Sequence, residues 1–359
     1  MKRLLLVGAG HAHAQVLKDW VASPLGGTEL VIVSPRAQAP YSGMVPGWLA
    51  GFYRFDEICI DFVALARAAG AHLVADEAAG IDPERRQLRL RSGAALDYDL
   101  ASLNVGSTLT PPRPPGVRVL SLRPLGRLHD AWEELLAAVT AAPRREPLQV
   151  TAVGGGAAGV ESLLAALARL RALLPQRSVH GTLVALSDDL LPGMSAGAAR
   201  AVRAALAAAG VTLRLGTVYD PAAANPTDVL LWATGAEAHD WPRASGLSVG
   251  PGGFVRIDRR LRSVSHPEVY AAGDCAEWAE PLPKAGVYAV RMGPVLSRNL
   301  RAALGAGGAI DYVPQRRFLA LLATADGSAV ASWGRWSAHG RWAWRWKDRI
   351  DRGFVRRFA

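Results

Sequence analysis

The sequence predicts an α/β protein with two Rossmann-like dinucleotide domains, and two glycine-rich turns are the main reason. Each turn follows a short apolar run and opens a helical stretch: residues 4–13, LLLVGAGHAH, and residues 150–161, VTAVGGGAAGVE. In a βαβ unit such glycines allow a tight turn and a close approach to a pyrophosphate, which the N–H groups of the helix start then bind. Two turns of this kind predict two bound dinucleotides.

The two turns differ in completeness. The second turn has glycine at all three motif positions, which are Gly154, Gly156 and Gly159. The first turn has Gly8 and Gly10 but His13 in the third position, so helix and strand must pack there by other means.

The residue that selects between NAD and NADP is missing from both halves. An acidic residue is expected on the ribose about 20 residues after the turn, but the next strands end at Ser34 and Ser187. A serine can bond a ribose hydroxyl without excluding a 2′-phosphate, so the choice of nicotinamide nucleotide stays open.

Composition narrows the class of protein. The 359 residues are half apolar, enough for two or three full cores. The chain runs from Met1 straight into an apolar strand, and no stretch approaches about 18 uninterrupted apolar residues, so we expect a cytoplasmic protein. The two cysteines, Cys59 and Cys275, are far apart in sequence, which predicts neither a disulfide framework nor a redox pair.

The apolar runs divide the chain into four parts. Residues 1–114 form the first part of the first nucleotide domain, 115–237 the second nucleotide domain, 238–315 the return to the first, and 316–359 a C-terminal hairpin and tail. The proline-rich stretch 110–116 marks the first boundary, because proline fixes φ and disfavours a helix before it.

A third motif brings a family resemblance. Residues 269–274, VYAAGD, are an apolar strand that ends in Gly273 and Asp274, and strands ending in Gly106 and Gly235 lie at the domain crossings. Together with the two turns, this pattern resembles the two-dinucleotide FAD/NAD(P) flavoproteins, the pyridine nucleotide-disulfide oxidoreductase-like family, over nearly the whole chain. Taken alone, Asp274 is equally a helix N-cap.

Within that family the chain looks most like the type II NADH dehydrogenases and the flavoprotein unit found joined to selenophosphate synthase. The closer likeness rests on residues 8–13, GAGHAH, 40–47, PYSGMVPG, and 284–291, KAGVYAVR. It implies FAD as cofactor, NADH or NADPH as hydride donor, and a small acceptor. Disulfide and sulfide:quinone reductases need reactive cysteines that this sequence does not offer.

The resemblance also implies roles for single residues. Asp274 bonds the ribityl chain of FAD, Lys284 lies near the pyrimidine edge of the flavin, and Glu161 lies near the nicotinamide; an ordinary surface lysine and a solvated helix residue are the alternatives for the last two. We read His11 and His13 as contacts to FAD or to the helix start, because two histidines are too few ligands for a metal. The cofactor-binding positions expected from the motifs are Gly8, Gly10, His11, His13, Ser34, Pro40, Gly106, Gly154, Gly156, Ala158, Gly159, Ser187, Gly235, Gly273, Asp274 and Lys284.

The acceptor is less well defined by the sequence. Type II dehydrogenases carry glutamines along the helix that meets quinone, whereas Val287, Arg291 and Met292 stand at the corresponding places here. An apolar pocket of Tyr41, Met44, Tyr288 and Met292 is expected to accept a quinone instead.

The C-terminal tail concentrates charge and aromatic residues. The net charge is +10, and residues 333–359 hold seven Arg and one Lys against two Asp, together with five of the eleven Trp. On a helix, apolar residues at every fourth position would form a stripe with these cations on either side, an arrangement that suits an anionic membrane surface. The stripe consists of Trp342, Trp346, Ile350, Phe354 and Phe358. Packing on the protein itself or on a second subunit is the alternative, because residues 342–346 alternate like a strand and residues 337–340 resemble a hairpin turn. Nucleic acid is disfavoured, since no nucleic-acid fold motif accompanies the basic residues.

The sequence therefore predicts an FAD-dependent NAD(P)H dehydrogenase that passes electrons to a quinone-like acceptor, in the cytoplasm or peripherally on the inner face of the cell membrane. Two alternatives remain: a soluble flavin reductase for a protein or a selenium or sulfur compound, and a redox sensor that holds FAD without significant turnover. The sequence does not predict the oligomeric state.

Overall fold

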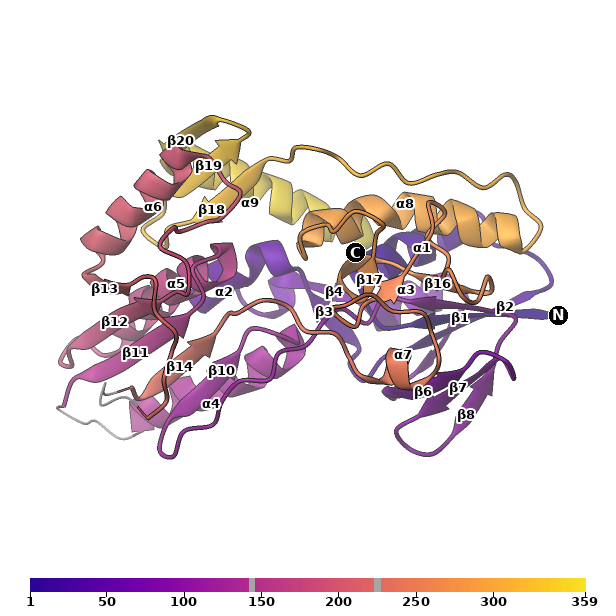
Figure 1. Ribbon diagram of the computed structural model, residues 1–359, viewed down its shortest axis with the longest axis horizontal. Coiled ribbons are helices and arrows are strands. Elements are labelled where there is room, and N and C mark those ends of the chain that lie inside the picture. The colour runs from indigo at the N-terminus through magenta and orange to yellow at the C-terminus, as the bar shows by residue number, and fades with distance from the viewer. Residues whose placement is uncertain (142–145, 223–226) are drawn as a thin grey trace.

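The computed structural model describes residues 1–141, 146–222 and 227–359, and it shows two lobes, each built around a five-stranded parallel sheet (Figure 1). The first sheet has the order β5-β2-β1-β9-β16, and every neighbouring pair is parallel. Its strands are β1 (Lys2–Val7), β2 (Thr28–Val33), β5 (His72–Val74), β9 (Leu100–Leu103) and β16 (Val269–Ala271). The second sheet has the order β10-β14-β11-β12-β13, also parallel throughout. Its strands are β10 (Arg118–Ser121), β11 (Leu148–Val153), β12 (Val179–Val184), β13 (Val211–Arg214) and β14 (Val229–Trp232).

Strand β16 shows that the first domain is split. It follows the whole second sheet in sequence, yet it pairs with β9 of the first sheet. The predicted architecture, with one Rossmann-like domain inserted into another, is therefore confirmed.

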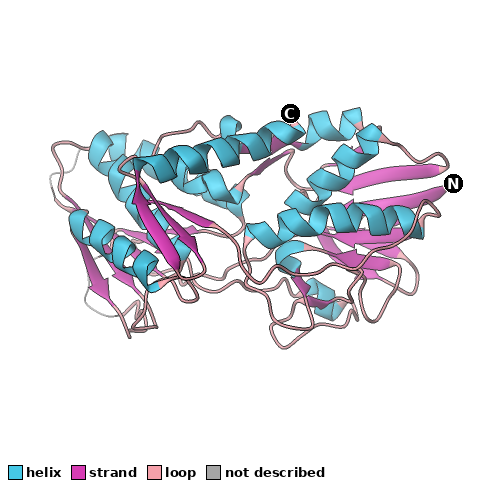
Figure 2. Cartoon of the chain, turned by 90° about the horizontal axis from the view of Figure 1, so that it is seen from above, coloured by secondary structure: helices cyan, strands magenta, loops and turns pink. Residues whose placement is uncertain are grey.

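Helices cover both sheets because the strands are apolar on both faces. Leu4, Leu5 and Leu6 of β1 are all fully buried, as expected for a central parallel strand. In the first lobe α1 (His11–Ala22) packs along α8 (Gly286–Ala303), and α3 (Phe62–Ala68) packs on α1. In the second lobe, α4 (Leu125–Ala141), α5 (Ala157–Leu173) and α6 (Ala196–Ala208) accompany the sheet (Figure 1). Figure 2 shows helices lying along the strands in both lobes.

Smaller elements complete the first lobe. They are a two-stranded pair of β3 (Gln38–Pro40) and β4 (Cys59–Asp61), an antiparallel sheet of β6 (Ala78–Asp82), β7 (Gln87–Leu90) and β8 (Ala95–Asp97), a parallel pair of β15 (Val255–Arg256) and β17 (Ala276–Glu277), the helix α7 (Trp241–Ala244), and the 3₁₀ turns η2 (Asp56–Ile58) and η3 (Gly273–Cys275).

A segment of the first domain is buried in the core of the second lobe. The 3₁₀ turn η1 (Ser42–Met44) leads into α2 (Val45–Leu49), which packs against α5. Met44, Trp48 and Leu49 belong to the same buried cluster as the apolar side chains of α5. The two lobes are therefore joined by shared core packing as well as by the two chain crossings.

The C-terminal part is a small antiparallel sheet and a helix. Strands β18 (Ala320–Ala323), β19 (Ala329–Trp333) and β20 (Trp336–Gly340) precede α9 (Arg341–Val355) and the 3₁₀ turn η4 (Arg356–Phe358). Residues 342–346 are helical, so the strand-like alternation was misleading. Residues 337–340 lie inside β20, and the hairpin turns at Gly334 and Arg335 instead.

Candidate active site at the two glycine turns

The first glycine turn brings β1, α1 and the end of β9 into close contact. Gly8 has a φ of +99°, and a Cβ there would lie 2.6 Å from the carbonyl oxygen of Asn104. The side chain of Asn104 accepts the N–H groups of Ala12 and His13 at 3.1 and 3.4 Å and so caps α1. Among the described residues, the N–H groups from Ala9 to His11 bond no protein acceptor, so the turn's own amides remain for a phosphate.

His13 takes over the packing function of the missing third glycine. Its Nδ1 lies 2.7 Å from the carbonyl oxygen of Gly8 and therefore donates to it, which leaves Nε2 to accept from the hydroxyl of Ser102 at 2.9 Å. The ring is fully buried, and burial lowers its pKa to about 4, so it is uncharged. Of the two readings given above, contact with the helix start describes His13.

His11 has different surroundings. Its ring contacts the rings of Tyr41 and Phe354, with centroids 5.4 and 5.8 Å away, and it bonds the backbone of Pro40. Burial lowers the pKa of His11 to about 4 in spite of the nearby Asp274 carboxylate. A neutral imidazole thus lies between the glycine turn, the Pro40 loop and the C-terminal helix.

Asp274 is part of an ion-pair cluster that the motifs did not reveal. The guanidinium group of Arg123 donates to the Asp274 carboxylate and to the Ser107 hydroxyl, and its other nitrogen donates to the Lys284 carbonyl at 3.1 Å. Arg123 follows β10, the first strand of the second lobe, just after the chain has crossed from the first domain. Sequence reasoning missed it because it is 151 residues from Asp274 and in no glycine motif; its place directly at a domain crossing was the available signal.

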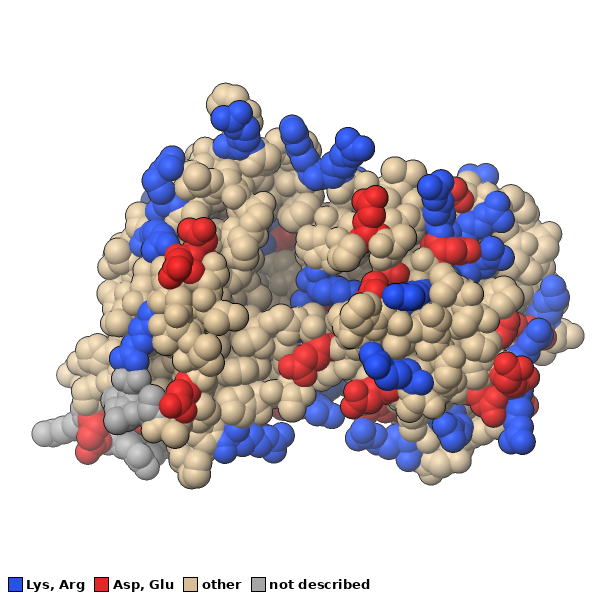
Figure 3. Space-filling view, viewed as in Figure 1, with Lys and Arg blue, Asp and Glu red and all other residues tan. Residues whose placement is uncertain are grey.

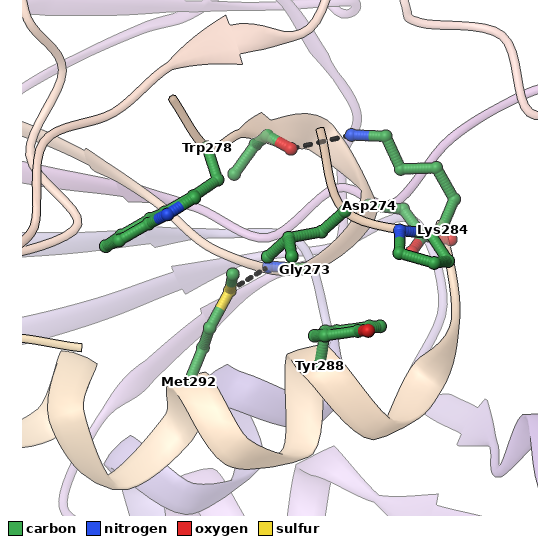
Figure 4. Close-up of a pocket in the computed structure, with 9 residues that line it drawn as sticks. Gly273, Asp274, Trp278, Lys284, Tyr288 and Met292 are labelled. Atoms are coloured by element: carbon green, nitrogen blue, oxygen red, sulfur yellow. Dashed lines mark hydrogen bonds between the residues drawn. The ribbon is translucent and has the colours of Figure 1, made fainter. Parts of the chain in front are cut away.

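Lys284 lies at this cluster, but its charge is directed elsewhere (Figure 4). Its ammonium group donates to the Ala276 carbonyl at 2.6 Å and lies 3.6 Å from the centroid of the Phe254 ring. Burial lowers its pKa. Here the guanidinium of Arg123, rather than the ammonium of Lys284, is the cation paired with the Asp274 carboxylate.

The second glycine turn is more open than the first. Gly154 has a φ of +128°, and Gly159 lies directly on the Gly154 carbonyl, as close helix–strand packing requires. Apart from the chain neighbours, no heavy atom of the described residues lies within 4 Å of a Cβ built on Gly156 or on Gly235. Gly156 is the N-cap of α5, which has no side-chain cap, and within the described residues the N–H groups of Ala158 and Gly159 have no protein acceptor. This cradle fits a pyrophosphate.

The two serines at the strand ends make local turns. Ser34 donates its hydroxyl to the Arg36 carbonyl at 2.8 Å, and Ser187 accepts the N–H of Asp189 at 3.1 Å. Ser187 is exposed beside two carboxylates, Asp188 and Asp189, while Ser34 is buried.

Glu161 is a half-buried group with a backbone partner rather than a solvated helix residue. Its carboxylate accepts the N–H of Ala323 in β18 at 2.7 Å, and burial raises its pKa to about 7 even though Lys347 opposes this. The Lys347 ammonium, itself buried in α9, bonds Asp351 at 2.6 Å and the carbonyl of Gly43. Helix α5, the Gly43 turn and α9 thus surround one buried ionic cluster.

The apolar pocket expected for an acceptor is divided in the structure. Tyr288 and Met292 line a pocket with Trp278 and Gly273 (Figure 4). Met44 is fully buried in the core of the second lobe, and Tyr41 packs on Phe354 at 4.4 Å between ring centroids. The four residues therefore do not form one pocket, because η1 directs Met44 towards α5.

Comparison with known proteins agrees with this geometry. Residues 2–293 match the pyridine nucleotide-disulphide oxidoreductase family. The ferredoxin–NAD(+) reductase component of the biphenyl dioxygenase system of Paraburkholderia xenovorans is 32% identical over 224 residues, 57% of this chain and 50% of that protein. This chain thus spans half the length of that relative. The mitochondrial internal alternative NAD(P)H-ubiquinone oxidoreductase A1 of Arabidopsis thaliana is 23% identical over 85% of this chain and 68% of its own length.

Solved structures share the fold at low identity. The structure of NDH2 from Plasmodium falciparum with NADH has a TM-score of 0.80 at 12% identity, covering 99% of this chain and 97% of that one. The sulfide:quinone oxidoreductase of Aquifex aeolicus has a TM-score of 0.76 at 15% identity, covering 100% and 91%. With two glycine turns, a split first domain and a family match over most of its length, this chain belongs to the pyridine nucleotide-disulphide oxidoreductase family of NAD(P)H-dependent flavin oxidoreductases.

Proposed function

We propose that this protein is an FAD-dependent NAD(P)H dehydrogenase of the type II kind, with a quinone-like acceptor. The first turn and Asp274 would hold FAD, and the cradle at Gly156 would hold the nicotinamide nucleotide. When bound, FAD accepts a hydride from the nicotinamide and passes electrons on. The residues present fit both nucleotides, because each helix start offers free N–H groups and neither has an acidic residue in its first turn.

The Arg123–Asp274 pair gives the first site its charge balance. The Asp274 carboxylate would accept from a ribityl hydroxyl, while the paired guanidinium of Arg123 holds that carboxylate in place. Because the same guanidinium also bonds Ser107 and the Lys284 carbonyl, it fixes three segments that would surround the flavin end of the cofactor.

The buried cluster at Glu161 carries the proposal about the acceptor. A quinone takes up two protons with two electrons, so its site needs groups that can supply protons near neutral pH. Glu161, with its pKa raised to about 7, holds a proton over the lower half of the physiological range, and Lys347 and Asp351 lie beside it. This arrangement suits a proton-coupled acceptor better than a one-electron protein carrier.

Two further observations support a small organic acceptor. Tyr288 at the start of α8 packs edge-on against Phe318, with centroids 6.0 Å apart, so aromatic faces lie between α8 and the segment leading to β18. Both cysteines are buried, and burial raises the pKa of each thiol, to about 12 for Cys59. Neither has the low pKa of a reactive thiol.

The outer face of α9 supports docking on an anionic membrane. Trp342, Trp346 and Ile350 remain 52%, 42% and 43% exposed, and the first two rings stack on each other at 6.2 Å. Arg345 and Arg349 lie on the same helix. Basic side chains also project around the C-terminal part and the hollow between the lobes (Figure 3). No helix among the described residues is long and apolar enough to cross a bilayer, so attachment would be at the surface.

Rapid-reaction kinetics of the Glu161→Gln variant test the acceptor proposal. The glutamine keeps an oxygen for the Ala323 N–H but cannot hold a transferable proton. Reduction of the FAD-bound variant by NADH should proceed at the wild-type rate, while its reoxidation by a short-chain quinone should slow at least tenfold. Equal slowing of flavin reduction and flavin reoxidation would contradict the role of Glu161 as a proton donor to the acceptor. If NADH reduces the flavin of the wild-type protein but no quinone supports repeated turnover, the redox-sensor alternative would be favoured.

Sedimentation with vesicles tests the membrane proposal. Replacing Trp342 and Trp346 together with serine should abolish binding to anionic phospholipid vesicles, and salt should weaken wild-type binding, because each cation near an anionic surface contributes about 1 kcal/mol. Val218→Ser, an exposed apolar residue of the second lobe, is the matched control and should bind like the wild type. Vesicle binding by the double variant would refute the proposal that this face of α9 docks on a membrane.

A further inference from the structure

Helix α9 and the turn after it carry two apolar regions, one exposed to solvent and one buried. The stripe predicted from the sequence runs through the whole helix, but only its first half is exposed. Phe354 and Phe358, which end the stripe, are 7% and 5% exposed. Their burial places the end of the chain against the first lobe, where α9 and η4 contact η1 and α1.

Phe354 packs on His11, at the first glycine turn, and on Tyr41, in the loop that follows β3. Its ring lies 4.4 Å from that of Tyr41 and 5.8 Å from that of His11, between centroids. His11 directly follows Gly10, and Tyr41 directly follows Pro40 in a loop that contacts the His11 ring, so the glycine turn and this loop meet the same phenylalanine. Phe358 supports Phe354 from behind at 5.2 Å, and the ammonium of Lys18 in α1 lies 5.8 Å from the Phe358 ring.

The position of α9 is fixed by polar contacts one and two turns earlier. Lys347 bonds the Gly43 carbonyl, and the Asp348 carboxylate accepts the Tyr53 hydroxyl at 2.6 Å. Arg352 bonds both Asp348 and Glu57 at 2.9 and 3.3 Å. These contacts all lead to the segment that carries Tyr41, so the helix cannot shift without moving one wall of the turn.

We propose that the end of α9 belongs to the FAD site, with Phe354 as a positioning residue that acts through His11 and Tyr41. The half-buried, neutral His11 imidazole contacts Tyr41, Phe354 and the Pro40 backbone, and it stands at the amides that remain free for the pyrophosphate. Removing the Phe354 ring opens these contacts to water and releases the first turn of α1. This inference rests on the proposed FAD binding, and it assigns the C-terminal turn to cofactor retention.

The test compares FAD release from variants of the FAD-loaded protein. FAD dissociation is followed by the recovery of flavin fluorescence, and the flavin environment by visible circular dichroism. Phe354→Ala should release FAD at least tenfold faster than wild type and change the visible dichroism. Val21→Ala, an exposed apolar position near the end of α1, is the control and should release FAD at the wild-type rate.

A second variant separates cofactor retention from folding. Phe354→Leu keeps most of the apolar volume but loses the ring contacts, so it should remain folded by far-ultraviolet dichroism and still release FAD several-fold faster. Release from Phe354→Leu at the wild-type rate would overturn the inference, whatever Phe354→Ala does. A wild-type protein that binds no FAD would instead overturn the proposed function, and so the two failures are distinguishable.

Discussion

The pH dependence of stability should change when Glu161 is replaced by glutamine. The carboxyl has an ordinary pKa of 4.5 and a pKa of about 7 in the folded protein. The folded state therefore binds this proton more tightly than the unfolded state, and the free energy of unfolding falls as pH rises from 4.5 through 7. A difference of about 2.5 pKa units corresponds to about 3.4 kcal/mol when the carboxyl is fully ionised.

Glutamine does not titrate, so it removes the fall in free energy of unfolding with rising pH. It still offers an oxygen that accepts the Ala323 N–H. Relative to wild type, Glu161→Gln should gain about 2 to 3 kcal/mol in free energy of unfolding between pH 5 and pH 8. Urea unfolding at several pH values, followed by far-ultraviolet dichroism, measures the difference. Glu134→Gln, an exposed glutamate of α4, is the control and should follow the wild type. Parallel curves for wild type and Glu161→Gln would show that the Glu161 carboxyl is not held protonated by burial.

Three further predictions concern the nucleotide sites. Gly156→Val fills the open cradle, so reduction by NAD(P)H should be lost while FAD stays bound; loss of FAD with unchanged nucleotide affinity would mean that the two domains are assigned in reverse. Arg123→Met leaves the largely buried Asp274 carboxylate without its cation, which costs about 1 kcal/mol or more. The affinity for FAD, measured by fluorescence titration, should therefore fall about tenfold. An unchanged affinity would show that Arg123 has no role in the FAD site. Asp188 and Asp189 should disfavour a 2′-phosphate, so Asp188→Ser should raise the affinity for NADPH relative to NADH about fivefold. This change corresponds to about 1 kcal/mol, the repulsion between like charges near 4 Å apart in water. An unchanged ratio of the two affinities would exclude a role for the Asp188 carboxylate.

The fold could be predicted because its signals are local. Gly8 and Gly154 are constrained by the turn that follows their own strand, and an apolar strand entering a glycine turn is visible within a dozen residues. The insertion of one domain in the other also followed from the order of the motifs along the chain.

The side-chain environments of the site could not be predicted in the same way. The cation at Asp274 comes from Arg123, across a domain crossing, and the direction of the Lys284 ammonium depends on Phe254 and Ala276. Likewise, the spacing of the stripe in α9 predicted an apolar face, but only the tertiary fold decides that Trp346 faces solvent while Phe354 faces Tyr41.

The burial of several side chains from residues 44–59 in the core of the second lobe limits how this protein can be recombined. Met44, Trp48 and Leu49 complete a core whose other side chains come from α5 and its sheet. A chimera that exchanged only residues 115–237 with a relative would bring a new α5 against the old α2, and mismatched volumes there would cost stability. The exchangeable unit is therefore discontinuous: the inserted domain can be replaced only together with this short segment of its host.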